Sequence, residues 1–158
     1  MDRITVVWGV GNEIMGDDAA GIYAAGLVRR RNIPWIRVFD CGTLPENYIY
    51  PLEKIRPDTL LIIDAADIGV EPGEIRLLKT DETGGAAFST HGIPIGVLLA
   101  PFEPGLRVRI LAIQPLGTRL GDEMSPPVRA AAERAAEAVC SRSWGRFPPI
   151  QRENLSPR

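Results

Sequence analysis

The segment Thr59-Leu60-Leu61-Ile62-Ile63-Asp64-Ala65-Ala66-Asp67 is the strongest strand signal in the chain. Its apolar residues follow one another without polar alternation, which is typical of a strand covered on both faces in a parallel sheet. Similar apolar runs at 4–10 and 106–114 are separated from it by segments with helical spacing, notably 19–31. This alternation predicts an α/β fold with a mostly parallel sheet of about five strands.

Weaker patterns complete the predicted order of elements. Residues 35–40 are predicted to form a strand, and 74–79 alternate polar and apolar residues as an exposed edge strand does. A short helix is expected at 46–55, with a kink or a late start because of Pro51. The segment 80–90 shows little periodicity and is expected to be a mobile surface loop. The remaining expected helices are 94–99 and one that follows Ser125 as its N-cap.

The composition limits the class of protein. With 158 residues, 45% apolar and 24% charged, the chain fits a single globular domain. A net charge of −2 and the absence of a basic stretch beyond Arg29–Arg31 argue against nucleic-acid binding. The two cysteines have no metal-site spacing, and neither a signal peptide nor a membrane-spanning run is evident, so we expect a cytoplasmic protein. We expect one domain at 1–140 and a Pro- and Arg-rich tail at 141–158 that is ordered only if docked.

A loop with paired glycines and paired carboxylates, Gly9–Asp18, joins the first predicted strand to the first predicted helix. Its Gly-Val-Gly turn is similar to a dinucleotide-binding fingerprint, but Ile14 occupies the place of the third glycine and no Walker lysine follows. The phosphate-binding chemistry is therefore incomplete. Within the carboxylate pair, Asp17 is expected to cap the helix or to face solvent.

Three residues far apart in the sequence are candidates for one metal site. Asp18 opens the first helix, Asp64 ends the longest apolar run, and His91, the only histidine, follows a loop. All three can meet at the carboxyl edge of the sheet, where the parallel strands end and where α/β proteins bind ligands. Two carboxylates and an imidazole suit nickel, zinc, manganese or iron. Alternatively, Asp18 caps the helix, Asp64 accepts hydrogen bonds from loop amides and His91 is structural.

A series of short motifs carries a family resemblance. They are Gly9–Asn12, Met15–Asp18, Asp40–Asn47, Leu61–Asp67, Pro72–Arg76, Ser89–His91 and Ile113–Pro115. In this order they resemble the hydrogenase maturation endopeptidases, most closely the branch that serves formate-hydrogenlyase-type, energy-converting [NiFe] hydrogenases. The similarity spans residues 4–139.

The resemblance implies a three-layer α/β/α fold and an endopeptidase that removes the C-terminal peptide of a [NiFe] hydrogenase large-subunit precursor after nickel insertion. By position, Asp18, Asp64 and His91 match the metal-binding residues of the family. The metal is expected to be the nickel of the substrate, with other divalent metals able to substitute, and it serves either catalysis or recognition alone. Asp40, which ends a predicted strand, is our candidate for the carboxylate that positions or deprotonates the attacking water. We expect a monomer.

Two residues depart from the family pattern. Glycine is common in the family at the positions of Ala19 and Cys41. If the backbone at position 19 had a positive φ, alanine would be unfavourable there. Cys41 is expected to pack as a small residue, because no second histidine is present to activate it as a nucleophile. Two other functions remain open at this point: a non-hydrolytic module that binds nickel or a small molecule, and a nucleotide-binding α/β protein.

Overall fold

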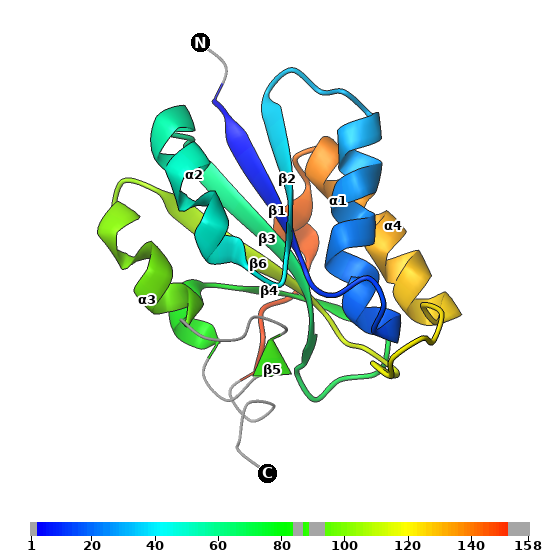
Figure 1. Cartoon of the computed structure of the whole chain (residues 1–158). Helices are drawn as coiled ribbons and strands as arrows, with labels where there is room; N and C mark the ends of the chain where they lie inside the picture. The colour runs from blue at the N-terminus through cyan, green and yellow to red at the C-terminus, as the bar shows by residue number, and fades with distance from the viewer. Residues whose placement is uncertain (1–2, 84–86, 89–93, 152–158) are drawn as a thin grey trace.

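The computed structural model describes residues 3–83, 87–88 and 94–151. The chain forms three layers, with a twisted sheet in the middle (Figure 1). Two long helices cover one face of the sheet, and two short helices cover the other (Figure 1). The predicted α/β/α architecture is therefore confirmed.

The sheet agrees with the predicted mostly parallel arrangement and with the predicted edge strand at 74–79. Its strands are β1 Thr5–Val10, β2 Ile36–Gly42, β3 Thr59–Asp67, β4 Ile75–Leu78, β5 Ala87–Phe88 and β6 Arg107–Ile113. The strand order is β2-β1-β3-β6-β4, in which only β4 runs antiparallel to its neighbour. The short β5 pairs antiparallel with the end of β3, so part of the expected loop at 80–90 is a strand.

The helices begin and end close to the predicted positions. They are α1 Ala20–Arg30, α2 Ile49–Ile55, α3 Ile95–Leu99 and α4 Pro126–Cys140, with 3₁₀ turns η1 Gly16–Ala19, η2 Pro45–Tyr48, η3 Thr80–Glu82, η4 Ala100–Phe102 and η5 Trp144–Arg146. The late start expected around Pro51 is confirmed, because η2 precedes α2 and Pro51 lies in the first turn of α2. Ser125 occupies the N-cap position of α4, but its side chain makes no capping hydrogen bond.

The central strand β3 supplies side chains to both cores. Every residue from 59 to 66 is buried, and alternate side chains point to opposite faces. Leu61 and Ile63 pack in the core under α1 and α4, whereas Leu60 and Ile62 pack in the core under α2 and α3. The continuous apolar run thus reflects burial on both faces.

Helix α1 approaches the sheet unusually closely at its first turn. A Cβ atom added to Gly21 would lie 2.5 Å from the carbonyl oxygen of Val10 and would also meet the carbonyl oxygen of Ile63. No side chain fits in that space, since non-bonded carbon and oxygen atoms normally stay beyond about 3 Å. Gly21 therefore lets the start of α1 rest directly on the end of β1 and on the middle of β3.

The first part of the C-terminal segment is docked. The guanidinium carbon of Arg142 lies 3.9 Å from the centre of the Trp35 ring. The backbone N–H of Leu77 donates to the carbonyl oxygen of Pro148 at 2.9 Å, and Ile150 is buried. The segment up to residue 150 thus lies beside β4, to which it makes an isolated bridge at Pro149, whereas 152–158 lie outside the described residues. The domain division at residue 140 stays a prediction.

Within the described residues, none of the helices has the length and apolar character needed to cross a membrane.

Candidate active site

The segments that carry Asp18 and Asp64 pack together at the carboxyl edge of the sheet. The 3₁₀ turn η1, which carries Asp18, packs against β3, which carries Asp64. The contact between Gly21 and the Ile63 carbonyl explains this placement. Asp18 precedes Gly21 by one helical turn, and Asp64 directly follows Ile63. The elements that carry the two carboxylates therefore pack against each other, whereas a shared site of Asp18 and Asp64 stays a prediction.

Asp64 is buried, with 1% of its surface exposed. It lies inside β3 beside Ala112 of β6 rather than at the strand end, because β3 continues to Asp67. A carboxylate is costly to bury in a sheet unless hydrogen bonds or a cation stabilise its charge. The burial of Asp64 therefore makes this carboxylate a candidate functional residue.

The side chain of Asp18 turns back toward the loop that precedes it. Its Oδ2 accepts a hydrogen bond from the backbone N–H of Asn12 at 3.0 Å. The N-cap position of α1 belongs to Ala19, and no side-chain capping bond is made there. The alternative in which Asp18 merely caps the helix is therefore not supported. The φ of Ala19 is −77°, so alanine fits where the family commonly has glycine.

Asp17 is the site residue whose environment the sequence did not predict. It is 1% exposed, so the expectation of a helix cap or a solvent-facing residue is wrong. Its Oδ2 accepts hydrogen bonds from the backbone N–H groups of Leu116 at 2.8 Å and Gly117 at 3.1 Å. Its Oδ1 accepts from the Ser125 N–H at 2.6 Å, and the Ser125 hydroxyl lies 2.8 and 2.9 Å from the two oxygens. Asp17 thus ties the loop of Asp18 to residues about one hundred positions away, which no local pattern indicates.

Asp40 lies at the same edge, across a small hollow. Its Oδ1 accepts a hydrogen bond from the backbone N–H of Gly42 at 3.0 Å, and its side chain is exposed at the end of β2. The hollow has a volume of about 240 Å³, and its wall includes Asn12, whose N–H contacts Asp18. The full lining is Gly11, Asn12, Glu13, Ile22, Asp40, Gly42 and Thr43. Asp40 is therefore close to the Asp18 loop.

Cys41 has no chemical role in this arrangement. It is 4% exposed and packs in the core under α2 and α3. Burial, and secondarily the negative charge of Asp40, raises the pKa of its thiol far above the ordinary value of 9.0. Because the thiolate is the nucleophilic form, a thiol held protonated is inert.

His91, the third candidate ligand, lies outside the described residues. In the part of the chain that the structure describes, no three His, Cys, Asp or Glu side chains come together as a metal site. Metal binding by Asp18, Asp64 and His91 therefore stays a prediction.

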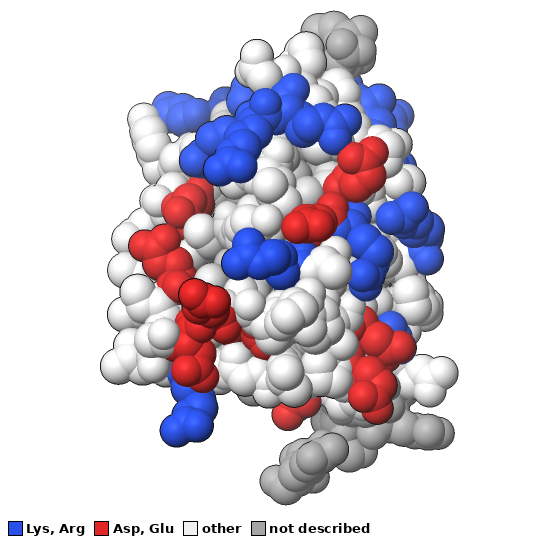
Figure 2. Space-filling model, turned by 90° about the vertical axis from the view of Figure 1, so that its right-hand side faces the viewer, with Lys and Arg blue, Asp and Glu red and all other residues white. Residues whose placement is uncertain are grey.

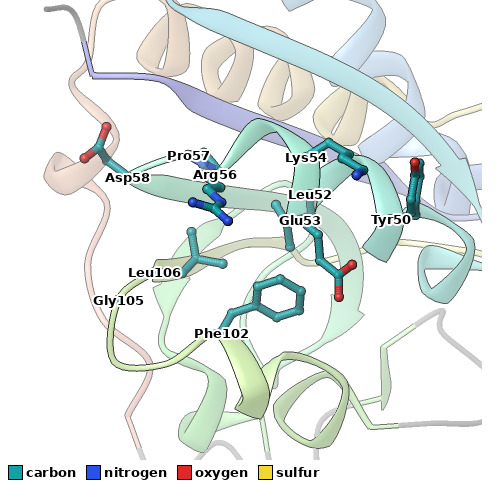
Figure 3. A pocket seen from close by; sticks show the side chains of 10 residues that line it. All are labelled: Tyr50, Leu52, Glu53, Lys54, Arg56, Pro57, Asp58, Phe102, Gly105 and Leu106. Carbon is teal, nitrogen blue, oxygen red and sulfur yellow. The ribbon is translucent and has the colours of Figure 1, made fainter.

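A larger hollow lies elsewhere. Its volume is about 960 Å³, and it opens between the end of α2 and the turn that leads into β6 (Figure 3). Leu52 and Leu106 form part of its wall, with Arg56 and Phe102 pointing toward it (Figure 3). This is the edge at which β3 and β6 begin, so the hollow contains none of the predicted site residues.

Charge is distributed unevenly over the face formed by α1 and α4. Lys and Arg side chains gather at the upper end of this face, and Asp and Glu side chains are more frequent in its lower half (Figure 2). Helix α1 follows the same direction, because Asp17 and Asp18 precede it and Arg29 and Arg30 occupy its last turn. Negative charges near the start of the helix and positive charges at its end interact favourably with the helix dipole.

The fold and the site define a three-layer α/β protein with a carboxylate-rich candidate active site at the carboxyl edge of its sheet. A family model for hydrogenase maturation proteases matches residues 24–142. The chain therefore belongs to the hydrogenase maturation protease family, and it is a peptidase.

Individual relatives agree with this assignment. The hydrogenase 3 maturation protease of Escherichia coli K12 is 36% identical over 127 residues, which cover 78% of this chain and 81% of that protein. The solution structure of the E. coli endopeptidase HycI superposes with a TM-score of 0.84 at 32% identity, covering 95% of this chain and 98% of that one. A [NiFe] hydrogenase maturation protease from Thermococcus kodakarensis superposes with a TM-score of 0.81 at 30% identity, covering 89% and 92%.

Proposed function

We propose that this peptidase removes the C-terminal peptide from the large-subunit precursor of a [NiFe] hydrogenase after nickel has been inserted. Family membership supports the substrate class, since a structural relative is described as a [NiFe] hydrogenase maturation protease. The observation that carries the proposal is the packing of Gly21 against β3, which holds Asp18 and the buried Asp64 at one edge of the sheet.

In this proposal the metal belongs to the substrate. Asp18, Asp64 and His91 supply two carboxylates and an imidazole, and the precursor supplies the remaining ligands of its nickel. Mixed oxygen and nitrogen ligands suit a divalent transition metal. Asp18 is already oriented by the Asn12 N–H, so its side chain loses little rotational freedom on binding. A precursor without nickel lacks the ion that joins it to the enzyme.

Hydrolysis adds water to the scissile carbonyl carbon, breaks the C–N bond and places a proton on the leaving amine. Nickel near that carbonyl polarises it or lowers the pKa of a bound water. We assign Asp40 to orient or deprotonate the water. It is exposed at the edge of the hollow, and a carboxylate that accepts one backbone N–H accepts further hydrogen bonds.

We further propose that the chain acts as a monomer in the cytoplasm. The precursor peptide must reach loops at the carboxyl edge, and self-association adds nothing to that reaction. Sedimentation of the purified chain tests the oligomeric state, and fractionation of cells tests the compartment.

The test of the function uses a nickel-loaded and a nickel-free precursor, each incubated with the purified chain and weighed by intact-protein mass spectrometry. We expect only the loaded precursor to lose a C-terminal peptide. Cleavage of both forms would contradict the nickel checkpoint. Nickel-dependent binding without cleavage would instead favour a non-hydrolytic binding module.

A further inference from the structure

Exposed apolar side chains gather beside the candidate active site. Among the described residues, the large hydrophobic side chains that are exposed are Ile14, Leu44, Tyr50, Val97, Leu116 and Leu120. Four of these lie on loops at the carboxyl edge, and only Tyr50 and Val97 lie on the helices α2 and α3. A single exposed hydrophobic residue needs no explanation, but a group of them marks an interaction surface.

Three of these residues belong to two loops that are bonded to each other. The backbone N–H of Gly121 donates to the carbonyl oxygen of Ile14 at 2.8 Å, so the loop with Leu116 and Leu120 lies against the loop with Ile14. Leu116 and Leu120 are 65% and 69% exposed, and Ile14 is 57% exposed. We call these three residues the apolar rim.

The apolar rim is held in place by buried polar groups. Asp17 accepts hydrogen bonds from Leu116, Gly117 and Ser125, and its own N–H donates to the Gly117 carbonyl at 2.9 Å. Gly16 has a φ of +59°, and a Cβ there would lie 2.8 Å from the Gly117 oxygen. Loops fixed before binding lose less entropy when a partner docks. Because these loops are fixed by hydrogen bonds, we interpret their exposed leucines as part of a binding surface and not as poorly packed core residues.

The rim continues into the candidate active site. Ile14 and Asp18 belong to the same loop, and Asp17, which anchors Leu116, is the neighbour of Asp18. Exposed acidic residues surround the rim, namely Glu13, Asp122 and Glu123, against one exposed cation in this segment, Arg119. A partner that covers the rim should therefore present apolar side chains flanked by Lys or Arg.

We propose that the apolar rim docks the folded body of the hydrogenase large-subunit precursor, through an apolar patch on the precursor that is bordered by basic residues. This inference rests on the proposed function. The rim side chains are more than half exposed and line neither of the two hollows described above, so they suit a protein surface better than a small molecule. Docking here brings the adjoining peptide of the precursor to Asp18 and Asp64.

The test compares two double variants that remove equally exposed side chains. Leu116→Ser/Leu120→Ser removes two of the three side chains of the apolar rim, and in Tyr50→Ser/Val97→Ser the substitutions lie on α2 and α3. With nickel-loaded precursor, we expect the rim variant to raise KM at least about 10-fold and to change kcat by less than about 2-fold. The α2/α3 variant should keep both constants of the unsubstituted chain. Thermal melting of both variants checks that the fold is intact.

Equal KM values for the two double variants would overturn the docking role while leaving the proposed function standing. If the unsubstituted chain does not cleave the precursor, the proposed function fails and this inference fails with it. Sedimentation gives a further decisive result: a dimer that dissociates on Leu116→Ser/Leu120→Ser substitution would assign the rim to a second copy of the chain and overturn the proposal.

Discussion

The carboxylate of Asp17 accepts a hydrogen bond from the backbone N–H of Ser125 at 2.6 Å, across 108 residues of sequence. Through this contact the loop that carries Asp18 is joined to the start of α4. Ser125 stands at the N-cap of α4, yet its hydroxyl contacts Asp17 and makes no capping bond. The two neighbouring aspartates thus have different partners, because Asp17 joins distant loops whereas Asp18 accepts a hydrogen bond from Asn12 in its own loop.

Replacing Asp17 by asparagine should destabilise the fold. The amide group turns one acceptor oxygen into a donor that faces backbone N–H groups, so we expect a loss of about 2 to 4 kcal/mol in the free energy of unfolding. Urea denaturation measures it. Asp122→Asn, on the exposed part of the same loop, is the control and should change little. Equal stability of the two variants would contradict the anchoring role.

Two glycines of α1 should respond in opposite directions to alanine. Gly21→Ala places a methyl group against the Val10 and Ile63 carbonyls, so α1 must shift at a cost of about 2 kcal/mol or more. Gly26→Ala meets no atom within 4 Å and should stabilise the helix by about 0.5 to 1 kcal/mol. Thermal melting distinguishes them. Because the shift moves Asp18 away from Asp64, Gly21→Ala should also lose cleavage activity, whereas Gly26→Ala should keep it.

The stability of the fold should fall in alkaline solution because of Cys41. Its pKa is raised above the ordinary value of 9.0 in the folded chain, chiefly by burial. Above that value the unfolded chain releases the thiol proton while the folded chain retains it, so the free energy of unfolding falls by up to about 1.4 kcal/mol per pH unit. Urea denaturation from about pH 8 to about pH 10 should show a shallower decline for Cys41→Ala than for the unsubstituted chain. Identical declines would refute this contribution.

The predicted metal ligands can be tested without a substrate. Added nickel should raise the melting temperature of the unsubstituted chain, and His91→Ala and Asp64→Asn should each reduce that response strongly. Glu71→Asn, an exposed carboxylate position outside the three, serves as the control. The ligand assignment is wrong if all of these proteins respond to nickel alike.

Most of the fold could be predicted because its signals are local. The apolar run of β3 indicates burial on both faces, and the alternation at 74–79 identifies the edge strand β4. The position of Asp18 next to a helix start and the presence of Asp64 in a buried strand were enough to predict their shared edge. These properties depend on neighbouring residues and on the geometry of parallel sheets.

The missed features depend on contacts between distant segments. The burial of Asp17 arises from Leu116, Gly117 and Ser125, and nothing near Asp17 in the sequence indicates those partners. The docking of 147–150 beside β4 likewise involves a distant segment, through the bridge between Leu77 and Pro149 and the burial of Ile150. Hydrogen bonds of this kind are specified by the whole fold and not by local periodicity.

We propose that the carboxylates at the carboxyl edge of the sheet serve cleavage of a nickel-loaded precursor. The most direct measurement is the intact mass of that precursor after incubation with the unsubstituted chain, with Asp64→Asn, and with Asp58→Asn as a control at the opposite end of β3. We predict a shortened precursor with the unsubstituted chain and with Asp58→Asn, and a full-length precursor with a folded Asp64→Asn variant. Cleavage by Asp64→Asn at the rate of the unsubstituted chain would contradict the role of Asp64 in this reaction.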